Sequence, residues 1–151
     1  MSTLKITVHG AGGRMGRALL SAIHRQDDLE LVGATESPNS TLLGQDSGVL
    51  AGTGENHILI TEQLEEAFAA ADVVIEFTRP NGTMRALDVL EKIPRKLVTG
   101  TTGHDPQQQQ RLADYARHHT VVQAANFSVG VNVAIKLTEL AARVLDDTAD
   151  V

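Results

Sequence analysis

The sequence predicts an α/β fold, doubly wound, in which a mainly parallel sheet carries helices on both faces. Three observations support this prediction. Short runs rich in β-branched residues alternate with helix-like patterns along almost the whole chain of 151 residues, as expected for parallel βαβ units. A glycine-rich turn joins the first such run to the first helical pattern. Hydrophobic residues make up 42% of the chain, enough for one sizeable core in a single domain.

The first half of the chain is expected to supply three strands and two helices. The expected strands are residues 4–9, residues 29–36 and the short HILI run at residues 57–60. A helix is expected from about residue 14 to residue 25, and a second one after Thr61. Thr61 is the expected N-cap, because Glu62 and Glu65 then lie early in the helix, where its dipole favours acidic side chains. Residues 37–56 are rich in Gly, Ser, Thr and Asn without clear periodicity, so we expect a surface loop there.

The second half is expected to add three strands and two helices. The expected strands are residues 72–77, 96–100 and 120–125. Asp105 and Pro106 fit the N-cap and the first position of a helix that continues through Tyr115. Ser128 is the expected cap of a last helix, whose apolar residues fall on one stripe. That stripe consists of Val133, Leu137, Leu140 and Val144.

Composition and charge argue against several classes of partner. The formal net charge is −6, and no basic patch is visible that would bind nucleic acid or an anionic membrane. No apolar run approaches the roughly 18 residues of a membrane helix, and the N-terminus lacks the apolar region of a secretion signal. The chain has no cysteine, which excludes disulfides and agrees with the cytoplasmic location that we expect. The histidines show no metal-ligand spacing, so we expect no metal site.

Ligands of an open α/β sheet bind beyond the carboxyl ends of the strands, where the strand order reverses. The first strand ends in GAGGRMG, in which Gly10, Gly13 and Gly16 follow the pattern G-x-x-G-x-x-G. Such a turn lets a pyrophosphate approach the amides at the start of a helix, although a tight turn without a ligand gives the same pattern. Glu36 lies 20 residues after Gly16, at the end of the next strand, where a carboxylate binds an adenine-ribose diol. The pair therefore favours a dinucleotide site over a bare turn.

Other strand ends carry small or hydrogen-bonding residues whose role the sequence leaves open. Arg14 in the glycine turn fits either a phosphate contact or a solvated first-turn arginine. The GTTG segment at residues 100–103 fits either a binding loop or an ordinary turn. Asn126 and Phe127 offer an amide and a ring to a flat ligand, while Phe127 fits the core equally well. Arg79, which precedes a proline, points into a cleft or flanks a helix start.

Four segments, in this order and spacing, resemble the cofactor domain of the dihydrodipicolinate reductase family, also called 4-hydroxy-tetrahydrodipicolinate reductases. They are VHGAGGRMGRAL, EFTRPNGT, VTGTTGHD and QAANFSVGVNV. The resemblance covers nearly the whole chain and implies a Rossmann-type dinucleotide-binding domain over residues 1–127. Residues 128–151 would be a helix and the start of a connection toward a substrate-binding domain. The resemblance also implies reduction of a cyclic, unsaturated dicarboxylate by NADH or NADPH, in the diaminopimelate route to lysine.

The resemblance further implies roles for individual residues. The glycine turn would hold the pyrophosphate, Glu36 would bind the adenine ribose, and Arg79 would lie near the cofactor cleft. Two later loops would surround the nicotinamide half, with Thr102 also near a carboxylate of the small-molecule substrate. The cofactor-binding residues implied in this way are Gly10, Ala11, Gly12, Gly13, Arg14, Met15, Glu36, Arg79, Gly100, Thr101, Thr102, Ala124, Ala125, Asn126 and Phe127.

Two departures from the family pattern limit what the resemblance implies. Ser37 stands where the family often has an arginine after the ribose acid, so the choice between NADH and NADPH is left open. The family's E-x-x-H-H-x-x-K segment, which supplies a catalytic histidine and lysine, is absent. We therefore expect no catalytic residue in this chain, which by itself would bind cofactor without turnover as part of a longer reductase. A homo-oligomer is expected only with the substrate-binding domain.

Two other functions remain open. A non-catalytic dinucleotide-binding module, acting as a redox sensor or a docking domain, would use the apolar stripe of the last helix as a dimer surface. A Rossmann reductase of another substrate would share the cofactor site and ignore the dipicolinate precursor. The GTTG and AANFSVGVN segments, which are specific to the resemblance, favour the dipicolinate reductase over both.

Overall fold

The structure, a computed structural model, describes residues 3–145 and contains a sheet of six parallel strands. The strands are β1 (Leu4–His9), β2 (Leu29–Thr35), β3 (Ile60–Thr61), β4 (Val73–Glu76), β5 (Lys96–Thr99) and β6 (Val121–Gln123). Their spatial order is β3-β2-β1-β4-β5-β6. The chain thus runs outward from β1 to β3 and returns to β4 on the other side of β1. This order confirms the predicted doubly wound sheet.

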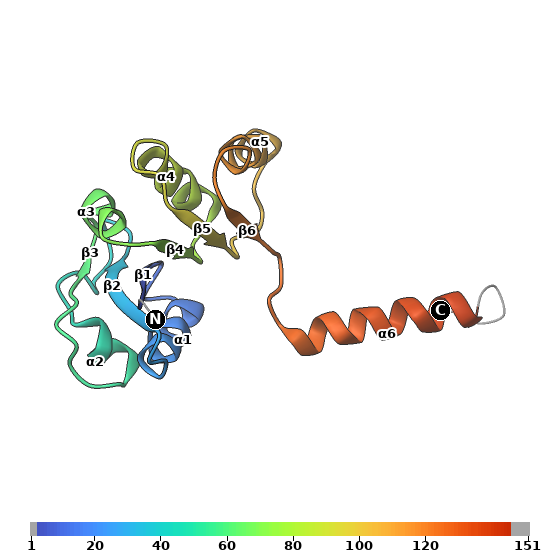
Figure 1. Cartoon of the computed structure of the whole chain (residues 1–151), viewed down its shortest axis with the longest axis horizontal. Coiled ribbons are helices and arrows are strands. Elements are labelled where there is room, and N and C mark those ends of the chain that lie inside the picture. The colour runs from blue at the N-terminus through green and yellow to red at the C-terminus, as the bar shows by residue number, and fades with distance from the viewer. Residues whose placement is uncertain (1–2, 146–151) are drawn as a thin grey trace.

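Helices cover both faces of the sheet, as predicted (Figure 1). The helices that cover the sheet are α1 (Arg14–His24), α2 (Ser47–Ala51), α3 (Leu64–Ala69), α4 (Pro80–Leu90) and α5 (Pro106–Ala116). The last helix of the described residues is α6 (Val129–Leu145). On one face, Ile23 of α1 belongs to a buried cluster against which α2 packs. On the other face, Phe68 of α3 belongs to a second cluster that includes side chains of α4 and α5. Val73 joins the first cluster and Val74 the second, because successive strand residues point to opposite faces.

The predicted strands and helices agree with the structure to within two residues, except around the third strand. The strand β3 contains only Ile60 and Thr61, and His57 has a φ of +62°, which interrupts the extended backbone before it. The prediction that Thr61 caps α3 was wrong. Thr61 pairs with Thr35 in the sheet, so α3 begins later and Gln63 precedes it.

One helix was missed by the sequence interpretation, and of another only the start was offered as an alternative. The predicted loop at residues 37–56 contains α2, whose first turn is held by Asp46. A carboxylate oxygen of Asp46 accepts hydrogen bonds from the amides of Gly48 (2.9 Å) and Val49 (3.0 Å). Five residues are too few to show a helical period. For α4, the sequence offered only a helix start after Arg79, because its opening residues Pro-Asn-Gly are typical of turns; Arg79 is the N-cap of this helix.

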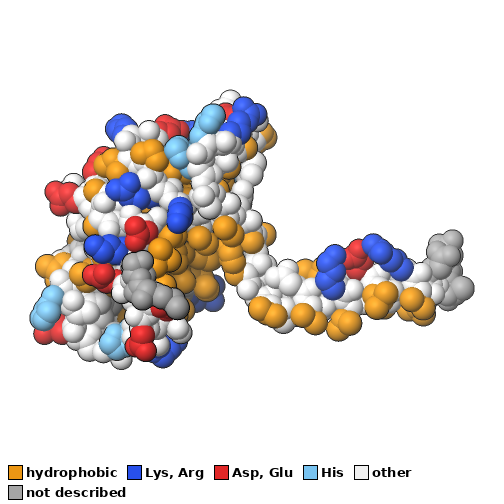
Figure 2. Space-filling model, in the orientation of Figure 1, with side chains coloured by type: hydrophobic (Ala, Val, Ile, Leu, Met, Phe, Trp, Pro, Cys, Tyr) orange, Lys and Arg blue, Asp and Glu red, His pale blue; other side chains and the backbone are white. Residues whose placement is uncertain are grey.

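The last helix, α6, extends away from the sheet and its other helices (Figure 1). Its predicted apolar stripe lies on the surface, where hydrophobic side chains follow one side of the helix (Figure 2). The exposed fractions are 51% for Val133, 62% for Leu137, 59% for Leu140 and 75% for Val144. The hydroxyl of Ser128 accepts a long hydrogen bond (3.4 Å) from the amide of Val131, as its predicted capping role requires. Within residues 3–145, no helix is both long enough and apolar enough to cross a membrane.

The glycine turn brings α1 directly against the end of β1. Gly10 has a φ of +87°, which only glycine adopts readily, and its amide donates to the carbonyl of Thr35 on β2 (2.9 Å). A Cβ atom on Gly16 would lie 2.1 Å from the carbonyl oxygen of Gly10 and 2.6 Å from that of Ala11. The helix can therefore approach the turn only because residue 16 has no side chain.

We expect Gly16→Ala to lower the free energy of unfolding by about 1–3 kcal/mol, because two backbone oxygens must move to admit the methyl group. Urea denaturation of both proteins measures this difference. Gly130→Ala is the matched control, since the nearest atom to its added Cβ would be 3.9 Å away. An unchanged unfolding midpoint in Gly16→Ala would contradict the close packing of α1 on the turn.

Candidate functional site

Two cavities share a wall at the carboxyl edge of the sheet, where the strand order reverses at β1. The first, of about 410 Å³, is lined by His9, Gly10, Gly13, Glu36, Ser37, Phe77, Thr78, Arg79, Asn81, Gly82 and Arg85. The second, of about 290 Å³, is lined by Gly13, Arg14, Met15, Phe77, Thr78, Arg79, Pro80, Gly100, Thr101 and Thr102. Their shared residues come from the glycine turn and from the loop after β4, so the two cavities adjoin. This edge is where ligands of doubly wound sheets bind.

The glycine turn presents the start of α1 to both cavities. Gly13 occupies the N-cap position and α1 has no side-chain cap, so the amide groups of its first turn have no side-chain acceptor. Backbone amides in this position suit an anion such as a pyrophosphate. Arg14 and Met15 are exposed and line the second cavity. Ala11 differs from the other predicted residues of the turn, because it is fully buried in the core between the sheet and α1.

Glu36 is bonded directly to the glycine turn. One oxygen of its carboxylate, Oε1, accepts from the amide of Gly12 (2.8 Å), and Oε2 accepts from the amide of Ser37 (3.1 Å). Both Glu36 and Ser37 line the first cavity. The two motifs paired by sequence spacing are therefore in contact, and a hydroxyl-rich ligand at this end of the cavity would meet a carboxylate and a serine side by side.

Two arginines line the first cavity together with Glu36. Arg79 precedes α4, and Arg85 lies within that helix. Among residues 3–145, neither guanidinium group has a hydrogen bond or an ion pair to another side chain or to the backbone. Unpaired guanidinium groups at the edge of a cavity favour an anionic or aromatic ligand. Arg85 was not among the residues predicted from the sequence.

The loops after β4 and β5 meet beneath the second cavity. Thr101 is 95% buried, and its hydroxyl donates to Oε1 of Glu76 (2.6 Å). Gly100 and the exposed Thr102 line the cavity on either side of Thr101. The fully buried Glu76 was missed by sequence reasoning, although a charged residue inside the apolar run DVVIEF was a usable signal.

The predicted residues after β6 lie at the margin of this site. Ala124, Ala125, Asn126 and Phe127 line neither cavity. The ring of Phe127 lies 5.8 Å, between centroids, from the ring of Phe77, which lines both cavities. The side-chain oxygen of Asn126 accepts from the amide of Ser128 (2.7 Å), and its backbone carbonyl accepts from the side chain of Asn132 (3.3 Å). These bonds hold the segment in the turn that leads into α6.

His9 is a second buried polar residue that sequence reasoning missed. Its Nδ1 atom lies 2.8 Å from the hydroxyl of Thr35, and its Nε2 atom is buried without a hydrogen-bond partner. Burial lowers the pKa of His9 below its usual value, and the nearby Glu76 carboxylate opposes this shift only in part. A histidine at the end of the strand that leads into the glycine turn was the available signal. Within residues 3–145, no group of three or more ligand-type side chains is placed to hold a metal ion.

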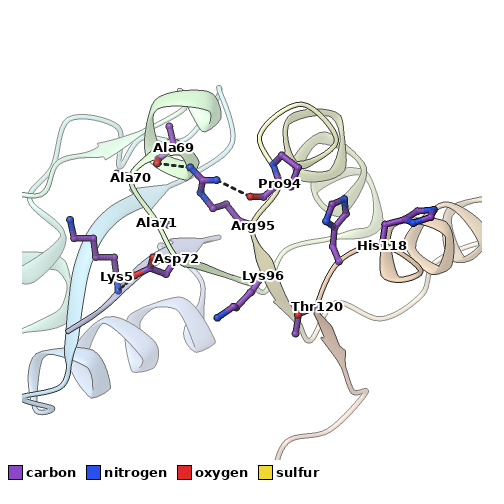
Figure 3. A pocket seen from close by; sticks show the side chains of 11 residues that line it. Lys5, Ala69, Ala70, Ala71, Asp72, Pro94, Arg95, Lys96, His118 and Thr120 are labelled. Atoms are coloured by element: carbon purple, nitrogen blue, oxygen red, sulfur yellow. Dashed lines mark hydrogen bonds between the residues drawn. The ribbon is translucent and has the colours of Figure 1, made fainter. Parts of the chain in front are cut away.

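A further cavity, of about 520 Å³, lies at the opposite edge of the sheet, near the amino ends of β1, β4, β5 and β6 (Figure 3). None of the predicted site residues lines it. Its central cation, Arg95, donates to the backbone carbonyls of Phe68 (3.0 Å), Ala69 (2.8 Å) and Pro94 (2.8 Å). Because these bonds occupy the guanidinium group, the arginine holds the chain together here. We therefore place the functional site at the carboxyl edge.

The carboxyl edge can hold a dinucleotide. Uncapped amides at the start of α1 suit its pyrophosphate, and the carboxylate of Glu36 suits a ribose diol. A Cβ atom at Gly13 would have only one protein neighbour, the carbonyl of Gly10 at 3.4 Å, which leaves the backbone there open to a ligand. The two adjoining cavities would receive the two halves of the molecule.

Comparison with known proteins agrees with this arrangement. A family model described as dihydrodipicolinate reductase, N-terminus, matches residues 4–127. The chain is 45% identical over 148 residues to the 4-hydroxy-tetrahydrodipicolinate reductase of Cupriavidus metallidurans, covering 98% of this chain and 56% of the relative. It is 43% identical to that of Syntrophotalea carbinolica, covering 98% of this chain and 55% of the relative. The chain thus spans about half the length of the curated relatives it matches.

A solved structure gives the same result for the fold. Dipicolinate-bound dihydrodipicolinate reductase from Paenisporosarcina sp. TG-14 superposes with a TM-score of 0.71 at 20% identity. The superposition covers 93% of this chain and 54% of that protein. The family match over residues 4–127, together with these relatives, shows that this chain belongs to the dihydrodipicolinate reductase family and corresponds to its N-terminal part.

Proposed function

We propose that this chain is the cofactor-binding part of a reductase that converts 4-hydroxy-tetrahydrodipicolinate to tetrahydrodipicolinate, in the diaminopimelate route to lysine. The observation that carries the proposal is the contact between Glu36 and the glycine turn at the reversal point of the sheet, in a chain of this family. NADH or NADPH is the proposed cofactor, and a cytoplasmic location is part of the proposal. When bound, the nicotinamide ring supplies the hydride for the reduction.

The residues of this chain would bind and orient the cofactor. The glycine turn and the uncapped amides at the start of α1 would hold the pyrophosphate, while Glu36 would accept hydrogen bonds from the adenine ribose. The loop 100–102 and Phe127 would surround the nicotinamide half, with Thr102 near a substrate carboxylate. The buried carboxylate Glu76 and the rigid strand ends would limit movement of these loops, so that the bound ring has one orientation.

We expect the purified chain to bind NADH or NADPH saturably, and Gly13→Asp to weaken that binding at least about tenfold. Asp at this N-cap position can support α1, since the backbone has a φ of −68° and ψ of 167°, but it places a negative charge beside the phosphates. Isothermal titration calorimetry measures both affinities. Gly13→Asn is the matched control for side-chain size. Equal affinities in the Asp and Asn variants would argue against phosphate binding at this turn.

We expect Glu36→Gln to weaken binding of NADH by about 10–100-fold, because a hydrogen bond to a charged acceptor is lost, and to weaken binding of NADPH much less. The amide retains an acceptor for Gly12, so the glycine turn stays in place, which Glu36→Ala would not ensure. Titration of each variant with both cofactors gives the two ratios. If NADH and NADPH lost affinity equally, recognition of the ribose by Glu36 would be refuted.

We expect the 151-residue chain alone to show negligible turnover of 4-hydroxy-tetrahydrodipicolinate, because the family's E-x-x-H-H-x-x-K segment is absent from it. Oxidation of NADH or NADPH, followed by absorbance, measures the rate, with the reductase of Cupriavidus metallidurans as the positive control. A rate within a few-fold of that enzyme would contradict the expectation. Binding of cofactor without turnover is also what a sensor or docking module would show, so this assay tests only the catalytic half of the proposal.

A further inference from the structure

Glu76 is a buried carboxylate without a cationic partner among residues 3–145. It ends β4, it is fully buried, and no ion pair involves it. A carboxylate in such a place is unfavourable unless donors satisfy its oxygens. The three residues before it, Val73–Ile75, contribute apolar side chains to the two cores. Glu76 is therefore the one charged residue of β4, and its role follows from its hydrogen bonds.

Five donors surround the Glu76 carboxylate. Oε1 accepts from the amide of Thr78 (2.8 Å), from the Thr78 hydroxyl and from the Thr101 hydroxyl (2.6 Å). Oε2 accepts from the hydroxyls of Thr99 (2.5 Å) and Thr83 (3.1 Å). Four different parts of the chain supply these donors: the loop after β4, α4, β5 and the loop after β5. The carboxylate of Glu76 thus links four segments of the chain by hydrogen bonds beneath the second cavity.

Two of these donors belong to residues that line the second cavity, Thr78 and Thr101. They also contact one another, since the Thr78 amide is shared between Glu76 and the Thr101 hydroxyl at 2.8 Å. Gly100 and Thr102, on either side of Thr101, line the same cavity. The position of the GTTG loop relative to the loop after β4 is therefore set by hydrogen bonds to Glu76. Among residues 3–145, the carboxylate of Glu36 makes no hydrogen bond to this cluster.

We propose that Glu76 is a positioning residue for the nicotinamide half of the cofactor: it holds the loops after β4 and β5 in the arrangement that forms the second cavity. The inference rests on the proposed function. In this inference Glu76 lies beneath the site and touches neither cofactor nor substrate. It affects binding of the nicotinamide half by holding the loops that surround it. The adenosine half depends instead on Glu36 and the glycine turn.

Glu76→Gln is the sharpest variant, because it preserves shape and changes only what the side chain offers. Its amide oxygen can still accept from the backbone amide of Thr78, which cannot reverse its role. Its NH₂ group would meet the hydroxyls that donate to Glu76, which must then rotate or lose their partner. Thr101→Val is the second variant. It removes the hydroxyl that donates to Glu76 and accepts from the Thr78 amide, and it leaves the other donors to Glu76 in place. Glu66→Gln on α3 is the control, because this side chain is exposed and has no hydrogen bond or ion pair within the described part of the chain.

The first readout is amide hydrogen exchange of the ligand-free chain. In Glu76→Gln we expect faster exchange in residues 78 and 100–102, with exchange in the glycine turn and β2 unchanged. The second readout compares titrations with NADH and with ADP-ribose, which lacks the nicotinamide. We expect Glu76→Gln and Thr101→Val to weaken binding of NADH about tenfold, a loss of about 1.4 kcal/mol, while the affinity for ADP-ribose changes less than about twofold.

The outcomes separate this inference from the proposed function. Unchanged exchange in the two loops, or equal loss of NADH and ADP-ribose in a folded Glu76→Gln, would overturn the positioning role while the wild-type affinities still support the function. If Glu76→Gln does not fold, the test rests on Thr101→Val, through its changes in affinity for NADH and for ADP-ribose relative to the wild type. A wild-type chain that binds neither ligand would refute the proposed function and, with it, a nicotinamide role for Glu76.

Discussion

The close approach of α1 to the turn after β1 is the constraint on which the carboxyl edge of the sheet depends. With no side chain at Gly16, the carbonyls of Gly10 and Ala11 lie against the helix. The amide of Gly12 donates to Glu36 at the end of β2, and the carbonyl of Gly12, in the next peptide group, accepts from Nε of Arg17 (3.0 Å). Helix, turn and second strand are thereby joined before any ligand arrives. A site assembled in this way loses little conformational entropy on binding.

The two sides of β1 are built on different physical principles. Toward β2, the half-buried carboxylate of Glu36 accepts hydrogen bonds from two backbone amides, those of Gly12 and Ser37. Toward β4 and β5, a fully buried carboxylate gathers hydroxyl groups from segments up to 25 residues apart. Hydrogen bonds in a buried network are stronger and more directional than in water, but each also costs more when its partner is missing. The second side is therefore held in its arrangement by buried hydrogen bonds.

The fold, and the pairing of the glycine turn with Glu36 in the candidate site, could be predicted from the sequence, because both follow from residue spacing along the chain. The glycine turn and Glu36 fall at fixed distances along a βαβ unit, so counting residues found the pair. Glu76 and His9 could not be found in this way, since their meaning depends on Thr35, Thr99 and Thr101, which only the parallel pairing of strands brings alongside. The helix α2 was missed because it is too short to show a period, and α4 was not placed as a whole because it begins with turn-forming residues.

The buried imidazole of His9 also links folding to proton concentration. Its pKa is lowered in the folded chain, because burial disfavours the charged ring. The unfolded chain, with an ordinary imidazole, takes up that proton first as the solution is acidified. Unfolding then becomes coupled to protonation, so the stability contributed by a neutral His9 is present above the ordinary histidine pKa and declines as the pH falls toward the lowered one. One ring beneath the cofactor cavity thus makes the fold itself sensitive to mild acid.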